Sequence, residues 1–251
     1  MDLELAGKKA LVTGGSRGIG KAVARALGAE GVEVTIAARD PDRLAATASE
    51  LSDLAGRRVH TAVVDTGSKE SVEALIATMS GAMGGADILV NAAARPGGQS
   101  PPPKFLEVTN EAFFEDMNVK VMGYLRVAQG VAPYMIANGW GRIINISGLA
   151  ARQAGALIGS MRNVAVAAMT KNLADELGPH HINVTVVHPG RTRTEATTPE
   201  LAAAPATNSI GHLVDAAEVA DVVCFLASPR SIAITGDAIA VGGGAHGAIY
   251  Y

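Results

Sequence analysis

The sequence predicts an α/β fold in which a mostly parallel, doubly wound sheet of about seven strands carries helices on both faces. Short apolar runs typical of buried strands alternate with helical periodicities along all 251 residues. No shift in composition and no linker divides this pattern, so we expect one domain over residues 1–251. A glycine-rich turn between the first strand and the first helix adds a nucleotide-binding signal.

Composition argues against several classes of protein. Apolar residues make up 48% of the chain and charged residues 18%, which is typical of a globular protein. The net charge of −3 and the lack of a basic block argue against nucleic-acid binding. No window is long and apolar enough for a membrane span, and no signal-peptide pattern is present, so we expect a cytoplasmic protein. The single cysteine, Cys224, lies in an apolar helical stretch and is expected to be a buried, inert thiol.

The first half of the chain alternates strand and helix signals that local residues delimit. The first strand is an apolar run, and the first helix has apolar residues at helical spacing. Asp40 followed by Pro41 indicates the start of a second helix, and Ser68 the start of a third, which a glycine cluster ends. The expected strands are 9–12, 33–38, 59–64 and 88–90, and the expected helices are 21–30, 40–55 and 68–85.

The second half repeats the pattern with longer helices. The expected helices are 110–138, 157–177 and 216–227, and the expected strands are 142–146, 183–188 and 238–241. Two loops lie at the carboxyl edge of the sheet, where α/β proteins bind ligands, and we expect both to contact a substrate. They are 92–109, with a Gly/Pro-rich stretch at 95–104, and the polar segment 189–214, which we expect to act as a mobile lid.

The glycine turn predicts a pyrophosphate site. Gly14, Gly18 and Gly20 stand between a strand and a helix, where the backbone can approach a ligand closely. The start of the helix offers unpaired N–H groups and the positive end of a dipole. The alternative is a turn whose glycines serve only close packing of the helix on the strand.

The residues after the second strand favour NADP(H) over NAD(H). An acidic side chain there binds the adenosine ribose of NAD, whereas an arginine accommodates the 2′-phosphate of NADP. Here Ala38 ends the strand and Arg39 follows it, while Arg17 stands inside the glycine turn. Asp40 is the competing ribose ligand, but Pro41 after it favours a helix cap.

Several motifs in order along the chain resemble the short-chain dehydrogenase/reductase family. They are TGGSRGIG at 13–20, Asp65, NAAA at 91–94, Asn118, GRIINIS at 141–147, NVTVVHPG at 183–190, Thr194 and a C-terminal LASP…ITGDAIAVGGG. The resemblance covers nearly the whole chain. It implies a Rossmann-type fold, a pyridine nucleotide cofactor and oxidoreductase activity.

The resemblance also implies roles for individual residues. Asp65 would accept from the adenine amino group, Asn91 would face the adenosine ribose, and Asn118 would anchor a water in a proton relay. Asn91 as a turn asparagine and Thr194 as a solvated hydroxyl are the alternatives. The implied cofactor-binding set is Gly14, Ser16, Arg17, Gly18, Ile19, Gly20, Arg39, Asp65, Asn91, Ala92, Ala93, Pro189, Gly190 and Thr194.

The chain departs from the family at its catalytic motif. The family uses a serine and then Tyr-x-x-x-Lys on the next helix, where the lysine lowers the pKa of the phenol and the phenol exchanges a proton with the substrate. No Tyr-x-x-x-Lys occurs in this sequence. Alignment on residues 170–174 puts Gly159 and Asn163 at the tyrosine and lysine positions, and the serine at Ser147 or Gly148.

The remaining candidates for catalysis are Ser147, Asn118, Arg162 and Asn163, and we expect no metal site. Arg162 could place positive charge on a substrate oxyanion, but its pKa makes it a poor proton donor. Several other tyrosine and histidine side chains are expected to have non-catalytic roles. Tyr124 and Tyr134 are expected to contact a partner subunit, His188 to be a satisfied core residue, and Tyr250 and Tyr251 to belong to a C-terminal tail.

Two functions fit these residues. The first is an NADP(H)-dependent oxidoreductase of the short-chain type that acts on a carbonyl or alcohol substrate with an altered catalytic set. The alternative is a catalytically inactive, nucleotide-binding relative that acts as a sensor or scaffolding subunit. In either case we expect a homo-oligomer, a dimer or a tetramer, because small and apolar residues cover more than one face of helices 110–138 and 157–177.

Overall fold

A parallel sheet forms the middle layer of the computed structural model, which describes residues 1–94 and 102–246. Its strands are β1 (Lys9–Thr13), β2 (Glu33–Ala38), β3 (His60–Val63), β4 (Ile88–Asn91), β5 (Gly141–Ile146), β6 (Ile182–Pro189) and β9 (Ala238–Val241). The seven strands have the order β3-β2-β1-β4-β5-β6-β9, and each neighbouring pair is parallel. The doubly wound α/β fold is therefore confirmed.

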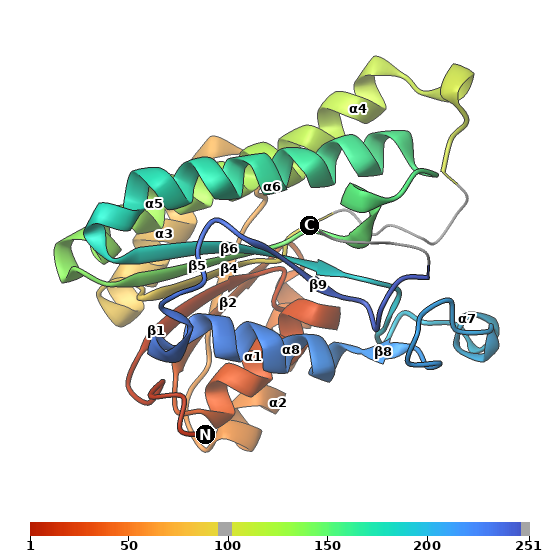
Figure 1. The fold of residues 1–251 in the computed structure, drawn as a ribbon. Helices are drawn as coiled ribbons and strands as arrows, with labels where there is room; N and C mark the ends of the chain where they lie inside the picture. Colours follow the sequence, from red (N-terminus) through yellow and green to blue (C-terminus); the bar gives the residue numbers. More distant parts are fainter. Residues whose placement is uncertain (95–101, 247–251) are drawn as a thin grey trace.

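Helices cover both faces of this sheet (Figure 1). The main helices are α1 (Gly18–Ala29), α2 (Pro41–Ala55), α3 (Lys69–Met83), α4 (Asn110–Met117), α5 (Gly123–Asn138), α6 (Leu157–Leu177) and α8 (Ala216–Ala227). One face carries α1, α2 and α8, and the other carries α3, α4, α5 and α6. Short 3₁₀ turns occur at η1 (Phe105–Glu107), η3 (Leu149–Arg152), η4 (Gly178–His180) and η5 (Pro229–Ser231).

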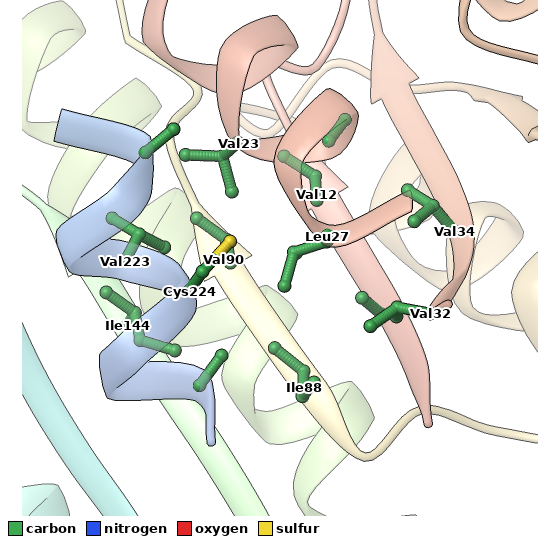
Figure 2. Close-up of a cluster of buried hydrophobic side chains, with 14 of the residues drawn as sticks. Val12, Val23, Leu27, Val32, Val34, Ile88, Val90, Ile144, Val223 and Cys224 are labelled. Atoms are coloured by element: carbon green, nitrogen blue, oxygen red, sulfur yellow. The ribbon is translucent and has the colours of Figure 1, made fainter. Parts of the chain in front are cut away.

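The core under α1 and α8 fixes the first helix against the sheet (Figure 2). Val23 and Leu27 of α1 and Val223 of α8 face Val12 and Val90 of the central strands, and all five are fully buried. Cys224 lies in the same cluster, and its burial raises the pKa of the thiol to about 12, which keeps it protonated. This packing holds the start of α1 at the carboxyl edge of β1.

The helix starts follow the expected chemistry. The Asp40 carboxylate accepts from Arg43 N (3.0 Å) and the Ser68 hydroxyl accepts from Ser71 N (3.1 Å), so both side chains are N-caps. Gly84 ends α3 in the left-handed region at φ 74°. Asp40 is thus engaged as the cap that Pro41 predicts.

The helix expected at 110–138 is interrupted, which corrects that expectation. A π-helical segment, η2 (Asn118–Met122), separates α4 from α5. Such a segment contains one extra residue per turn and rotates the side chains that follow it. The backbone oxygens there find other donors: Thr66 Oγ1 donates to Val119 O (2.9 Å), and Arg126 donates to Asn118 O (3.3 Å).

The segment 189–214 is more ordered than the polar loop expected from its composition. It contains β7 (Thr192–Arg193) and α7 (Pro199–Ala203), and β7 pairs in parallel with β8 (Val214–Asp215). Loop 92–109 lies partly outside the described residues, because residues 95–101 are not described. Among the helices that the structure describes, none has both the length and the apolarity needed to cross a membrane.

Candidate functional site

A cleft of about 1300 Å³ opens at the carboxyl ends of the strands. The sheet order reverses between β1 and β4, and this switch point is where doubly wound sheets bind ligands. The glycine turn after β1 forms one wall, and the segments after β4, β5 and β6 form the others. We call the part near Arg39 the β2 end and the part near Ser147 and Asn163 the β5–α6 end.

The glycine turn is built for close backbone approach. Gly14 has φ +69°, and a Cβ there would stand 2.7 Å from Ala92 O. A Cβ on Gly20 would collide with the carbonyl of Gly14. A side chain at position 14 would force apart the loops that follow β1 and β4, and one at position 20 would push α1 away from the turn that precedes it. These glycines therefore permit close packing of the two turns, and they place the N-terminus of α1 at the wall of the cleft.

A carboxylate already occupies the N-terminus of α1. Gly18 N donates to Glu195 Oε2 (2.9 Å), and Lys21 Nζ lies 3.9 Å from Glu195 Oε1. Glu195 comes from the segment after β6, so an anion from a distant part of the chain sits at the positive end of the helix. This contact is a direct sign that the turn can bind an anion such as a pyrophosphate.

Positive charge gathers at the β2 end. Arg17 and Arg39 line the cleft with exposed side chains, as expected from the sequence, and Arg43 of α2 joins them. Asp65 also lines this end, where its Oδ1 accepts from Gly67 N (2.9 Å). The residues present therefore fit a dinucleotide with an additional phosphate on its adenosine ribose.

The cleft brings together most of the residues singled out in the sequence. Those that line it are Gly14, Ser16, Arg17, Gly18, Ile19, Gly20, Arg39, Asp65, Ala92, Ala93, Ser147, Arg162, Asn163, Pro189, Gly190 and Thr194. Asn91 and Asn118 are not part of its lining. Among the described residues, no group of His, Cys, Asp and Glu could hold a metal ion.

Asn91 and Asn118 make structural contacts instead. Asn91 is fully buried and its Nδ2 donates to Asn145 Oδ1 (3.0 Å). Asn118 Nδ2 donates to Gly67 O (3.0 Å), and Asn118 Oδ1 accepts from Arg126 (2.8 Å). The Asn118 side chain thus contacts the β3–α3 loop and α5 and does not line the cleft, while its role in anchoring a water stays a prediction.

Lys120 lines the cleft at the β5–α6 end, beside Ser147 and Asn163. Its side chain is buried and its Nζ donates to Ser147 O (3.2 Å) and Asn163 Oδ1 (3.1 Å). Burial lowers the pKa of this amine to about 7, with the nearby Arg162 charge acting in the same direction. Ser147 Oγ donates to Asn163 O (3.2 Å), so three polar groups are tied together.

Arg162 is held by a carboxylate. Its Nη1 contacts both oxygens of Asp116 on α4, at 2.7 and 2.8 Å, and both side chains are largely buried. The guanidinium still lines the cleft, so it offers a fixed positive charge there. Gly159, one turn earlier on α6, adds no side chain to the site.

Tyr124, which borders the cleft, and His188 are both buried and hydrogen-bonded to backbone atoms. Tyr124 is fully buried and donates to Ile146 O (2.9 Å), so its expected use at a subunit contact is wrong. His188 Nδ1 accepts from Gly148 N (3.4 Å), and burial lowers its pKa to about 4, which leaves the ring neutral. Tyr250 and Tyr251 lie outside the described residues.

The cleft residues that sequence reasoning missed include Lys120, Arg43 and Glu195. Arg43 stands four residues after Arg39 and just inside a capped helix, so its place beside the β2 end could have been inferred. Lys120 and Glu195 left no such signal, because a lysine in a long amphipathic helix and a glutamate in a polar loop usually face solvent.

Comparison with known proteins identifies the family of this chain. The model of the short chain dehydrogenase family matches residues 8–204. The chain is 33% identical to the 3-oxoacyl-[acyl-carrier-protein] reductase FabG of Aquifex aeolicus, over 97% of this chain and 99% of the other. It is 36% identical to the L-xylulose reductase of Mesocricetus auratus, over 97% and 98%.

A solved structure shows the same architecture. The L-sorbose reductase of Gluconobacter frateurii, complexed with NADPH and L-sorbose, superposes with a TM-score of 0.91 at 29% identity, covering 99% of this chain and 100% of the other. The family match and the identities extend over most of the chain, and the fold and cleft agree with them. This chain therefore belongs to the short-chain dehydrogenase/reductase family of oxidoreductases.

Proposed function

We propose that this protein is an NADP(H)-dependent oxidoreductase that interconverts a carbonyl compound and its alcohol with an altered catalytic set. The observation that carries the proposal is the cleft itself. It joins an anion-binding helix terminus and three arginines at the β2 end to a group of polar side chains at the β5–α6 end. The first two features suit a phosphorylated dinucleotide, and the third suits a polar reacting group.

The charges at the β2 end support NADP(H) over NAD(H). Arg17, Arg39 and Arg43 converge on the cleft, and a guanidinium binds a phosphate in bidentate geometry. Asp40, the side chain that could have bound a ribose hydroxyl, is committed to Arg43 N and to an ion pair with Arg43 at 3.8 Å. Gly14, Gly18, Ile19 and Gly20 would hold the pyrophosphate, and Pro189, Gly190 and Thr194 the nicotinamide side.

The catalytic set of this proposal lacks the family's tyrosine and lysine. The bound cofactor supplies or accepts the hydride. Gly159 and Asn163 stand where the alignment expects the tyrosine and lysine, and neither can transfer a proton. Arg162, fixed by Asp116, places positive charge where a substrate oxyanion would form, and Ser147 helps to orient the Asn163 backbone.

The inactive nucleotide-binding relative is the second candidate, and it has less support. Its basis is the missing Tyr-x-x-x-Lys, yet the β5–α6 end keeps polar and charged groups that a scaffold would not need. The relatives reported above are named as reductases of carbonyl compounds: a 3-oxoacyl thioester, L-xylulose and L-sorbose. We infer that the substrate enters between loops 92–109 and 189–214.

A homo-oligomer of even number, in the cytoplasm, completes the proposal. Phe114 on α4 and Met161 and Val164 on α6 are large apolar side chains that are about half exposed or more. The two helices contact each other, so these residues belong to one region of the surface. Apolar surface of this kind is typical of subunit contacts.

We expect the purified protein to oxidise NADPH in the presence of a suitable ketone. The panel should include L-xylulose, L-sorbose, a 3-oxoacyl thioester and simple diketones, with NADPH consumption followed by absorbance. Loss of general acid–base help slows such reactions by about 10²–10⁴-fold, so long single-turnover incubations are needed. If NADPH binds but no compound is reduced above the background rate, the inactive relative becomes the better description.

The substitution Arg39→Ala should weaken NADPH binding by about 10- to 100-fold, because a guanidinium–phosphate pair is lost. NADH carries no 2′-phosphate, so its affinity should change by less than about 2-fold. Arg25→Ala, which removes an exposed arginine of α1 outside the cleft lining, is the matched control. Titration of intrinsic or nucleotide fluorescence measures both affinities, and tighter binding of NADH than NADPH by the unmodified protein contradicts the cofactor assignment.

Glu195→Gln should tighten NADPH binding by about 3- to 10-fold. The Glu195 carboxylate occupies Gly18 N, where a phosphate would bind, so removal of its charge removes a competitor. Glu50→Gln is the control, because it frees Lys21 from its other partner at 2.8 Å and leaves Gly18 occupied. Equal gains in the two variants would assign the effect to Lys21, and no gain in Glu195→Gln would show that the carboxylate does not compete.

Sedimentation at micromolar concentration should give the mass of a dimer or tetramer. Val164→Glu should shift the protein toward smaller species, because a charge would enter the apolar contact. Leu54→Glu, at an exposed apolar position on α2, should leave the mass unchanged. A monomer for the unmodified protein contradicts this part of the proposal.

A further inference from the structure

Lys120 is a buried lysine without a structural ion pair. It is 3% exposed, yet it lines the cleft at the β5–α6 end. Two of its three N–H bonds point to Ser147 O and Asn163 Oδ1, at 3.2 and 3.1 Å. Among the described residues, no carboxylate forms an ion pair with it. The third N–H is therefore available to a molecule in the cleft.

The lysine belongs to the π-helical segment that separates α4 from α5. Within η2, the Asn118 side chain bonds to Gly67 O and Arg126, whereas Lys120 Nζ donates to Ser147 O and Asn163 Oδ1. Thr66 and Arg126 bond the backbone oxygens in this segment. A distortion held by its own hydrogen bonds, at the wall of a ligand cleft, is typical of a functional site.

The charged and titratable groups around Lys120 come from four elements. Arg162 of α6 faces it and is paired with Asp116 of α4. The ring centroid of Tyr124 of α5 lies 6.0 Å from Lys120 Nζ. The positive charge of Lys120 also contributes to lowering the pKa of His188 of β6. Burial and Arg162 lower the pKa of Lys120, whereas Asp116 raises it, and the result is about 7. The amine can therefore gain and lose a proton near neutral pH.

The neighbouring groups cannot do this. The guanidinium of Arg162 is bonded to both oxygens of Asp116. The Tyr124 hydroxyl donates to Ile146 O, and burial raises its pKa. The His188 ring accepts from Gly148 N and does not line the cleft, and its pKa of about 4 keeps it neutral. Ser147 has no activating base.

We propose that Lys120 exchanges the proton with the substrate oxygen, in place of the tyrosine that this chain lacks. During reduction the carbonyl carbon gains a hydride, the oxygen takes a proton from Nζ, and the neutral amine regains a proton from water. During oxidation the neutral amine accepts the alcohol proton. This assignment rests on the proposed function, which supplies the hydride. Asn163 and Ser147 O orient the amine for the transfer.

The kinetic test compares Lys120→Arg and Lys120→Met with Lys171→Met. Arginine keeps the positive charge but cannot release a proton, so Lys120→Arg separates proton transfer from charge alone. We expect kcat for reduction to fall at least 100-fold in both Lys120 variants, with the dissociation constant of NADPH within about 3-fold of wild type. Lys171, which pairs with Asp175 on the exposed side of α6, should be replaceable without effect.

The pH dependence is a second kinetic readout. In the wild-type protein, kcat for reduction should fall as the pH rises through about 7, because the amine then loses its proton, and kcat for oxidation should rise. Lys120→Arg should lack this inflection in its residual activity. An Arg variant that keeps the wild-type rate or the wild-type pH profile overturns the proposal.

A titration that needs no substrate keeps the two proposals distinguishable. In protein labelled with ¹³C at lysine Cε, one resonance should titrate near pH 7 in the wild type and be absent from Lys120→Arg. If every lysine titrates with an ordinary pKa, the assignment of Lys120 is wrong even when turnover is found. If the resonance is present but no carbonyl compound is reduced, the proposed function has failed and the proton transfer with it.

Discussion

The close approach of two backbone turns is the constraint on which the site depends. Gly14 and Ala92 follow neighbouring parallel strands, and a single Cβ on Gly14 would stand 2.7 Å from the Ala92 carbonyl. Because the turns nearly touch, α1 begins directly at the edge of the cleft, where its first N–H group, Gly18 N, donates to the Glu195 carboxylate. The apolar cluster under α1 and α8 keeps that helix in place. The position of this N–H group at the cleft is thus a consequence of packing.

The cleft has a conventional half and a divergent half. At the β2 end, backbone and arginines are arranged as the family's motifs imply. At the β5–α6 end, the positive charge expected on α6 comes from η2, on the opposite wall. Helices α5 and α6 lie on the same face of the sheet (Figure 1). Lys120, just before α5, and Asn163 of α6 both hydrogen-bond to Ser147, so a charged group from the segment before α5 reaches the same residue as α6 does.

Most of the fold could be predicted from the sequence, because strand runs, helical spacing and caps such as Asp40 and Ser68 are local signals. Many residues of the cleft lining could be predicted too, since they follow strands directly. The π-helical segment could not, because its apolar pattern continues that of the flanking helices. Lys120 was missed with it, because a lysine in a long amphipathic helix usually faces solvent. The Glu195 contact joins positions 177 residues apart, for which no local signal exists.

Asn163 and Lys120 are best understood as a coupled pair. A lysine at position 163 would bring a second ammonium group beside a buried one, and the two would repel each other strongly away from water. Asn163 instead offers Oδ1 as an acceptor to Lys120 Nζ, so the amide satisfies one N–H of the buried amine. Arg162 adds a further positive charge next door, but Asp116 balances it at 2.7 Å. Because Asp116 pairs with Arg162, no carboxylate among the described residues forms an ion pair that would hold the proton on Lys120. The low pKa of Lys120 therefore follows from its burial and the Arg162 charge, while Asn163 supplies the acceptor that a second lysine could not.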